Sequence, residues 1–118
     1  MSYIFVADDF TGASDTLATL ARAGMRTRLF PDVPRADEVR ELDAWGVATE
    51  ARSLDKKGIT ALARRIGAGL FAHRPDFLHV KICSTFDSSD TIGNIALLVR
   101  GLSDAIGVPD IAVIAGQP

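Results

Sequence analysis

The sequence has few of the features that would assign it to a specialised class. Its single cysteine, Cys83, cannot form an intrachain disulfide, so a disulfide-stapled secreted domain is excluded and a cytoplasmic location is expected. The formal net charge is only −2, and no stripe of Lys and Arg with aromatics argues for nucleic acid as a partner. No apolar run approaches the ~20 residues of a membrane span. The first strand-like run starts at Tyr3, so we expect no signal peptide.

What the sequence does contain is an alternation of short apolar runs with helical patterns. A length of 118 residues and 47% hydrophobic residues suit one soluble domain, residues 1–118. Runs rich in strand formers predict strands at residues 3–7, 25–30, 44–48, 77–82 and 110–115. Apolar residues spaced by three and four predict helices at about 13–23, 53–70 and 91–106.

This order predicts an α/β fold. We expect a five-stranded parallel sheet with helices on both faces, a Rossmann-like arrangement of three layers. The segment 35–42 is expected to be a short polar helix or an irregular excursion. No helix follows the fifth strand in this sequence, so we expect a truncated domain, a piece of a longer protein. A fifth strand without a covering helix would expose apolar surface. We expect a missing domain or another subunit to cover that surface, and a homo-oligomer is one such arrangement.

Polar residues cluster where the first strand ends. This cluster consists of Asp8, Asp9, Thr11, Gly12 and Asp15. In a parallel sheet, ligands bind outside the carboxyl ends of the strands, near the start of the next helix. A carboxylate there could accept a proton from a substrate hydroxyl. The alternative is that the acids only cap the helix and that the single glycine only forms a turn, and the pattern alone leaves both open.

Two later clusters are expected at the same edge of the sheet. Arg52 follows the third strand, and Lys81 ends the fourth strand before Ser84 and Thr85. Arg52 and Lys81 could bind a carboxylate or phosphate. A lysine at the end of a buried strand needs a partner to offset desolvation, whereas Arg52 alone could be a solvated surface residue. His73 and His79 lack metal-ligand spacing, so we expect structural roles for both and no metal site.

Four segments together resemble the four-carbon acid sugar kinase family (DUF1537-type). They are Asp8-Asp9-Phe10-Thr11-Gly12-Ala13-Ser14-Asp15, Gly24-Met25-Arg26-Thr27, Thr49-Glu50-Ala51-Arg52-Ser53, and Lys81-Ile82-Cys83-Ser84-Thr85 before Gly93-Asn94-Ile95. The resemblance spans almost the whole chain, with its motifs in the family's order. Three departures are visible: Ala48 and Cys83 stand where the family usually has Asp, and Phe86–Ile92 replaces a short link that carries an arginine.

The resemblance implies ATP-dependent phosphorylation of a hydroxyl on a tetronate-type sugar acid by a two-domain protein. This chain would be the N-terminal, sugar-acid-binding part, inactive alone. ATP and Mg²⁺ would bind mainly to a C-terminal domain that is absent here. Asp9 and Asp15 would contact substrate hydroxyls, one of them as general base, and Asp8 would orient the loop. Thr11 and Gly12 would line the site, and the carboxylate end would be bound by Arg52, Lys81, Ser84 and Thr85.

Other classes explain the residues less well. A response-regulator receiver also has an acidic pair after its first strand, but it needs a phosphoacceptor Asp after the third strand, where this chain has Thr49 and Glu50. A haloacid-dehalogenase-type phosphatase needs Asp-x-Asp-x-Thr, and Ala7 occupies the nucleophile position. The remaining alternative is a small-molecule-binding α/β module without catalysis.

Overall fold

The computed structural model describes residues 3–75, 77–82, 93–107 and 111–115. Five strands form one sheet: β1 (Tyr3–Ala7), β2 (Thr27–Phe30), β3 (Ala44–Ala48), β4 (Leu78–Ile82) and β5 (Ile111–Ala115). Their order across the sheet is β2-β3-β1-β4-β5, and every neighbouring pair is parallel. The predicted five-stranded parallel sheet is therefore confirmed, with the first strand at its centre.

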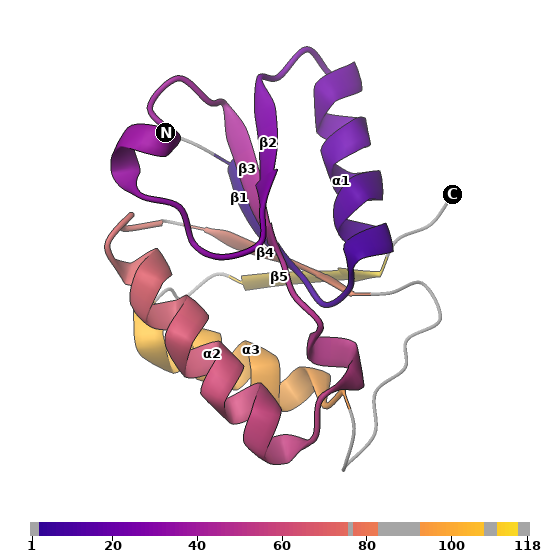
Figure 1. Ribbon diagram of the computed structural model, residues 1–118, viewed down its shortest axis with the longest axis vertical. Coiled ribbons are helices and arrows are strands. Elements are labelled where there is room, and N and C mark those ends of the chain that lie inside the picture. The colour runs from indigo at the N-terminus through magenta and orange to yellow at the C-terminus, as the bar shows by residue number, and fades with distance from the viewer. Residues whose placement is uncertain (1–2, 76, 83–92, 108–110, 116–118) are drawn as a thin grey trace.

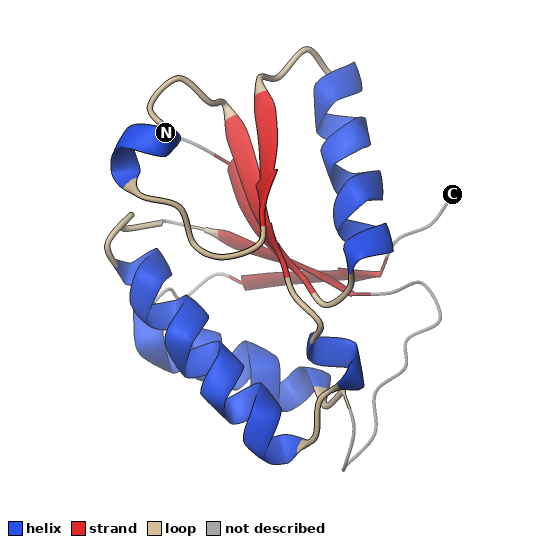
Figure 2. Cartoon of the chain, in the orientation of Figure 1, coloured by secondary structure: helices blue, strands red, loops and turns tan. Residues whose placement is uncertain are grey.

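The helices lie on both faces of this sheet (Figure 1). Helix α1 (Phe10–Arg22) connects β1 to β2 on one face. Helices α2 (Lys56–Phe71) and α3 (Ile95–Ile106) lie together on the other, and short 3₁₀ turns span Ala36–Glu38 (η1) and Ala51–Ser53 (η2), as Figure 2 shows. Crossovers between parallel strands are right-handed, so the direction of a crossover along the sheet decides which face its helix covers. The crossover through α1 runs toward β2 and those through α2 and α3 run toward β5, which places α1 on the opposite face from the other two. The three-layer prediction is confirmed.

The strand order also bears on the receiver alternative. Receiver-type domains have the order 2-1-3-4-5. Here β3 lies between β2 and β1, so the order differs at the centre of the sheet. This argues against a receiver, although the length and the acidic pair are compatible with one.

The larger of two hydrophobic cores lies between the sheet and the α2–α3 pair. It contains the fully buried Trp45 and Leu70. The two helices approach closely because glycines face alanines. A Cβ on Gly67 would lie 2.4 Å from Ala105 Cβ, and one on Gly101 would lie 2.5 Å from Ala63 Cβ. No methyl group fits at either glycine unless a helix moves.

The smaller core lies under α1 and is built from Phe5, Ala7, Ala13 and Ala48. The ring of Phe5 occupies the space over the neighbouring strand at Gly46, where an added Cβ would lie 2.1 Å from Phe5 Cζ. The glycine that weakens the third strand by propensity is thus required by the packing of the first.

Helix starts differ from the sequence prediction because acidic and amide side chains, rather than the apolar spacing, set them. Helix α1 begins at Phe10, three residues before the predicted start, because Asp9 caps it. Asp55 caps α2 by accepting a hydrogen bond from Gly58 N, so that helix begins at Lys56 rather than at about residue 53. Asn94 caps α3, so that helix begins at Ile95 instead of about residue 91. Carboxylate and amide oxygens are among the strongest N-caps.

The strand and helix ends are closer to prediction. The second strand begins at Thr27 rather than at residue 25, and Gly24 follows α1 with a φ of +88°. Glycine after a helix commonly adopts this left-handed conformation. Predicted segment 35–42 contains only the short turn η1.

None of the helices in the described part of the chain has the length and apolar character of a membrane span.

Candidate functional site

The segments that follow β1 and β3 meet the end of β4 at one edge of the sheet. The backbone N–H of Asp8 donates to Lys81 O at 3.0 Å, and Arg52 N donates to Asp8 O at 3.1 Å. Connections leave β1 and β4 in opposite directions along the sheet, which makes this the topological switch point where ligands bind in open α/β sheets. The predicted convergence is therefore found for Asp8, Arg52 and Lys81, whereas Ser84 and Thr85 of the third cluster lie outside the described residues.

Asp9 is the best-connected side chain at this edge. Its Oδ1 accepts a hydrogen bond of 2.7 Å from Gly12 N, which caps α1. Its Oδ2 accepts a hydrogen bond of 2.9 Å from Arg52 Nη1, and the two side chains are 13% and 37% exposed. Both expected roles of Asp9, helix cap and site residue, are thus compatible with its position. The partnership with Arg52 was not predicted.

Lys81 carries a buried positive charge into the same place. Its residue is 6% exposed, and Nζ donates a hydrogen bond of 2.7 Å to Ile82 O. A Cβ on Gly12 would lie 3.1 Å from Lys81 Nζ and 2.7 Å from Asp9 Oδ1. The absence of a side chain at Gly12 therefore lets the ammonium, the carboxylate and the first turn of α1 approach one another.

Asp8 and Thr49 form the floor of the site. Asp8 is buried at the end of β1. Thr49 is also buried, and its hydroxyl donates to Ala7 O at 2.7 Å and accepts from Ala51 N at 3.3 Å. Sequence reasoning treated Thr49 only as part of a polar loop. The available signal was a hydroxyl directly after a buried strand, where it can donate to a carbonyl of the neighbouring strand; here it joins Thr49 N, which donates to the same Ala7 O at 3.0 Å.

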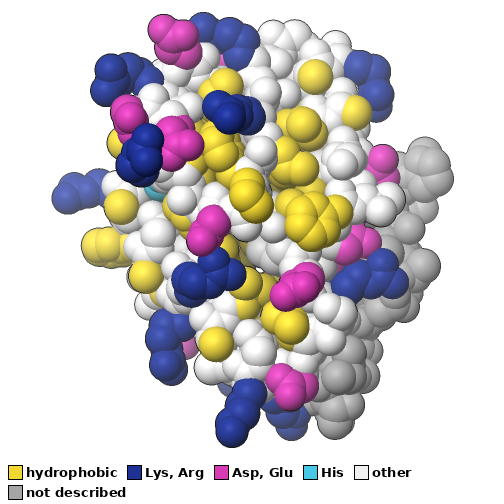
Figure 3. Space-filling model, viewed as in Figure 1, with side chains coloured by type: hydrophobic (Ala, Val, Ile, Leu, Met, Phe, Trp, Pro, Cys, Tyr) yellow, Lys and Arg dark blue, Asp and Glu magenta, His cyan; other side chains and the backbone are white. Residues whose placement is uncertain are grey.

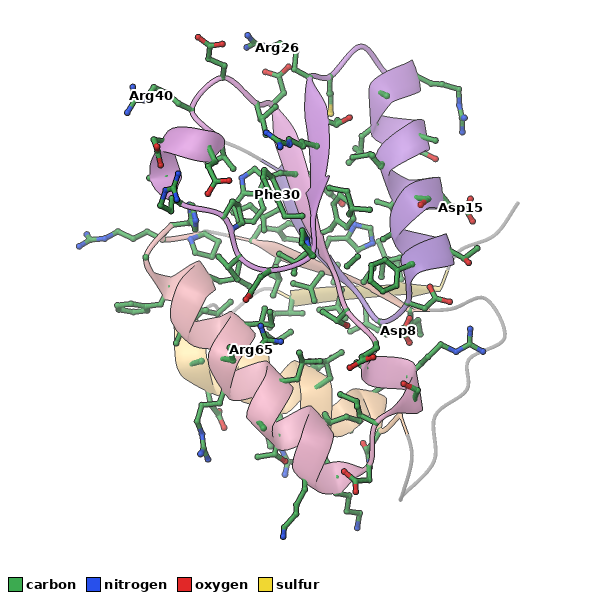
Figure 4. All side chains as sticks on the ribbon, viewed as in Figure 1. Asp8, Asp15, Arg26, Phe30, Arg40 and Arg65 are labelled. Carbon is green, nitrogen blue, oxygen red and sulfur yellow. The ribbon has the colours of Figure 1, made fainter. Side chains whose placement is uncertain are left out.

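The remaining predicted site residues are either exposed or lie outside the described part of the chain. Thr11 and Asp15 are exposed on α1. Figure 4 shows Asp15 on the outer side of the helix, whereas Asp8 lies at the edge where the helix begins. Ser84, Thr85 and Cys83 lie outside the described residues. The roles of all four remaining site residues, Thr11, Asp15, Ser84 and Thr85, stay predictions.

Both histidines have structural partners. His73 Nε2 lies 2.7 Å from Pro34 O, and the His73 ring lies 4.8 Å from that of Trp45. His79 Nδ1 shares a hydrogen bond of 2.7 Å with the Tyr3 hydroxyl. Burial, followed by the charge of Lys81, lowers the pKa of His79 below its ordinary value of 6.5. The Tyr3–His79 pair was not predicted, because the two residues are far apart in the sequence.

Neither a basic surface patch nor a group of metal ligands is found in the views and residues described. On the face shown in Figure 3, Lys and Arg side chains are interspersed with Asp and Glu and do not form one basic patch. Among the residues that the structure describes, no three or more His, Cys, Asp and Glu side chains gather as metal ligands do.

Comparison with known proteins points to one group of relatives. The family model described as "Sugar-binding N-terminal domain" matches residues 3–118. A 3-oxo-tetronate kinase of Methylobacterium radiotolerans is 42% identical over 98 residues, which cover 82% of this chain and 23% of that protein. A 3-oxo-tetronate kinase of Escherichia coli K12 is 32% identical over 104 residues, which cover 88% of this chain and 26% of that protein. The chain spans about a quarter of the length of these relatives.

Solved structures with a similar fold also match the chain. A Salmonella typhimurium LT2 protein, provisionally named a tRNA synthase, superposes with a TM-score of 0.77 at 30% identity, covering 91% of this chain and 26% of its own. A domain of unknown function (DUF1537) from Bordetella bronchiseptica, solved with bound citrate as a domain-swapped dimer, superposes with a TM-score of 0.70 at 27% identity. It covers 89% of this chain and 26% of its own.

Proposed function

The chain belongs to the family of sugar-binding N-terminal domains, and from that membership we propose that it forms the sugar-acid-binding part of a kinase. The proposed reaction is ATP-dependent phosphorylation of a hydroxyl on a four-carbon acid of the tetronate or 3-oxo-tetronate type. The observation that carries the proposal is the pair of cations, Arg52 and Lys81, held beside Asp9 at the start of α1. A small molecule with a carboxylate at one end and hydroxyls along its length matches that set of groups.

Each side chain has a proposed part in binding. Lys81 supplies a buried point charge for the carboxylate, and Arg52 supplies a planar fork of donors. Asp9 orients Arg52 and accepts from a substrate hydroxyl. Each Asp9 oxygen accepts one hydrogen bond in the described structure and has a second lone pair, which can accept a proton from a substrate hydroxyl. Asp15, Ser84 and Thr85 remain proposed substrate contacts on the strength of the family resemblance.

The described residues do not fit a nucleotide–metal site. The N-terminus of α1, where a phosphate would bind, is capped by the Asp9 carboxylate. The acidic groups also do not gather as metal ligands in the part of the chain that the structure describes. We therefore place ATP and Mg²⁺ mainly on polypeptide beyond these 118 residues. We expect this chain to bind a sugar acid without turning it over.

The partner proposal follows from β5. Val113 and Ile114 are exposed at this edge strand, which carries no charged residue and no proline to protect it. We propose that further polypeptide, either a C-terminal domain or another subunit, covers this edge in a cytoplasmic, oligomeric protein. The relatives' greater length supports the first source.

The binding proposal is tested by thermal unfolding and calorimetry of this chain with erythronate, threonate and 3-oxo-tetronate, against erythritol as a matched uncharged ligand. A specific ligand at about 100 times its dissociation constant stabilises a fold by about 2.7 kcal/mol. We expect one of the acids to stabilise the chain, and Arg52→Met and Lys81→Met to lose that effect. Lys57→Met, an exposed cation of α2, is the control and should keep it. Equal effects of erythritol and the acids would disprove the assignment.

A further inference from the structure

A buried histidine lies beside the site on the same side of the sheet as Lys81. In the β1–β4 pairing, His79 is opposite Phe5 and Lys81 is opposite Ala7. Phe5 and Ala7 belong to the core under α1, so both β4 side chains face that layer. Residues two apart on a strand stand about 7 Å from each other on one face. On this face of β4, His79 is therefore the neighbour of Lys81 on the side away from the carboxyl end of the strand.

The contacts of His79 fix the position of its ring. The imidazole is 6% exposed and packs against the rings of Tyr3 and Phe5, at centroid distances of 5.7 and 6.2 Å. Nδ1 is held by the Tyr3 hydroxyl. Nε2 is buried and has no hydrogen-bond partner among the described residues. The ring is thus positioned by one polar contact and by aromatic packing.

Among the described residues around this imidazole, Lys81 is the charged group that affects its pKa. From β1 it meets Tyr3 and Phe5, and from β5 its register neighbour is Ala112. The buried residues of α1 are Gly12, Ala13 and Thr16, none of which titrates. The charged neighbour is Lys81, which acts with burial to lower the pKa of His79. The state of the lysine's surroundings therefore affects the histidine directly.

We propose that His79 is a positioning residue of the anion site, such that anion binding at Lys81 and proton binding at His79 favour each other. The inference rests on the proposed function, since it needs an anion at Lys81. A carboxylate there offsets the positive charge that opposes an imidazolium, and such coupling is reciprocal. Two charges about 7 Å apart change an equilibrium by roughly 3-fold in bulk water and by roughly 50-fold at an effective dielectric constant of about 20, so we expect a change of about tenfold, equivalent to about one pH unit.

Nuclear magnetic resonance of the two imidazoles tests the coupling, because the chain has only two histidines. His73→Gln assigns the signals, and His73 in the wild type is an internal control on Pro34. Erythronate is the probe and erythritol its uncharged match. We expect saturating erythronate to raise the His79 titration midpoint by about one pH unit, with no change at His73. Erythritol should change neither midpoint.

Two further measurements separate the outcomes. Lys81→Met should raise the His79 midpoint without any ligand, and an unchanged midpoint in a folded variant would overturn the coupling whatever the ligand does. Calorimetry from about pH 5 to 8 should show erythronate binding about tenfold more tightly at the acidic end, with this gain lost in His79→Gln. Erythronate that binds while His79 does not respond would overturn this inference and leave the proposed function intact. No binding by any four-carbon acid would remove both.

Discussion

The guanidinium of Arg52 lies 2.9 Å from the Asp9 carboxylate and so joins the segment after β3 to the first turn of α1. The other oxygen of Asp9 accepts from Gly12 N. One carboxylate thus combines a helix cap with an ion pair at the edge of the sheet. The two roles are separable, because an amide oxygen caps a helix about as well as a carboxylate does but carries no charge.

Asp9→Ala should lower the free energy of unfolding by about 1–2 kcal/mol, because the cap of α1 is lost. Asp9→Asn should keep most of that stability, since the ion pair with a 37%-exposed arginine contributes only about 0–1 kcal/mol. Both variants should bind sugar acid more weakly than wild type. Urea unfolding and calorimetry measure the two effects. Equal stability of the Asp9→Ala and Asp9→Asn variants would contradict the capping role.

Gly46→Ala should destabilise the chain by roughly 1–3 kcal/mol, because the new methyl group overlaps the buried ring of Phe5. Urea denaturation gives the difference. Phe5→Leu in the same background should recover part of the loss by making room for the methyl. If Gly46→Ala alone proved as stable as wild type, the close approach of the ring to this strand would be wrong.

Gly67→Ala tests the contact between α2 and α3. Alanine gains about 1 kcal/mol over glycine in a helix, but overpacking against Ala105 costs roughly 1–3 kcal/mol, so we expect a net loss of stability. The double variant Gly67→Ala with Ala105→Gly moves the methyl from one helix to the other and should be close to wild type. A double-mutant cycle measured in urea would show this as a large coupling energy, and additive effects would contradict it.

Gly12→Ala should weaken sugar-acid binding more than it weakens the fold. The added Cβ meets Asp9 Oδ1 and the flexible end of Lys81, which moves at small cost in stability but away from its position in the site. We expect a loss of affinity of about tenfold or more by calorimetry, the cost of one charge-assisted contact, with nearly unchanged thermal unfolding. Unchanged affinity would show that the ligand lies elsewhere.

Stability should depend on pH through His79. Its pKa in the folded chain lies below 6.5, so the unfolded chain takes up the proton first as the pH falls. The free energy of unfolding should therefore be level above about pH 7 and fall as the pH drops below 6.5 through the folded value. Urea midpoints from about pH 5 to 8 measure this slope. His79→Gln should reduce the slope, and an unchanged slope in this variant would refute it.

The sequence predicted the sheet well because its strands are local features. Residues 3–7, 44–48 and 78–82 are short apolar runs whose strand character is visible without any partner. Helix starts were less accurate, because Ser53 and Asp55 are both good caps and lie close together in the sequence. The η2 turn takes up Ser53 and leaves Asp55 as the cap of α2.

The sequence predicted which residues meet at one edge of the sheet, but not which of their side chains pair. Parallel strands bring Asp8, Arg52 and Lys81 to one edge, and that much follows from strand order in the sequence. The pairing of Asp9 with Arg52 and that of Tyr3 with His79 depend on β1 lying between β3 and β4. No local pattern contains that information, since β1 is first in the sequence but central in the sheet.

That central place of β1 has a consequence for how the chain reaches its fold. Tyr3 pairs with Ala44 and Phe5 with His79, so β1 completes its pairing only after the two later strands β3 and β4 have been synthesised. Long-range parallel pairing of this kind makes folding slow, because the entropy cost of closing the loops comes before the stabilising contacts form. Until β4 is available, the apolar run 3–7 lacks one of its neighbouring strands, and such exposed apolar segments favour aggregation and chaperone binding.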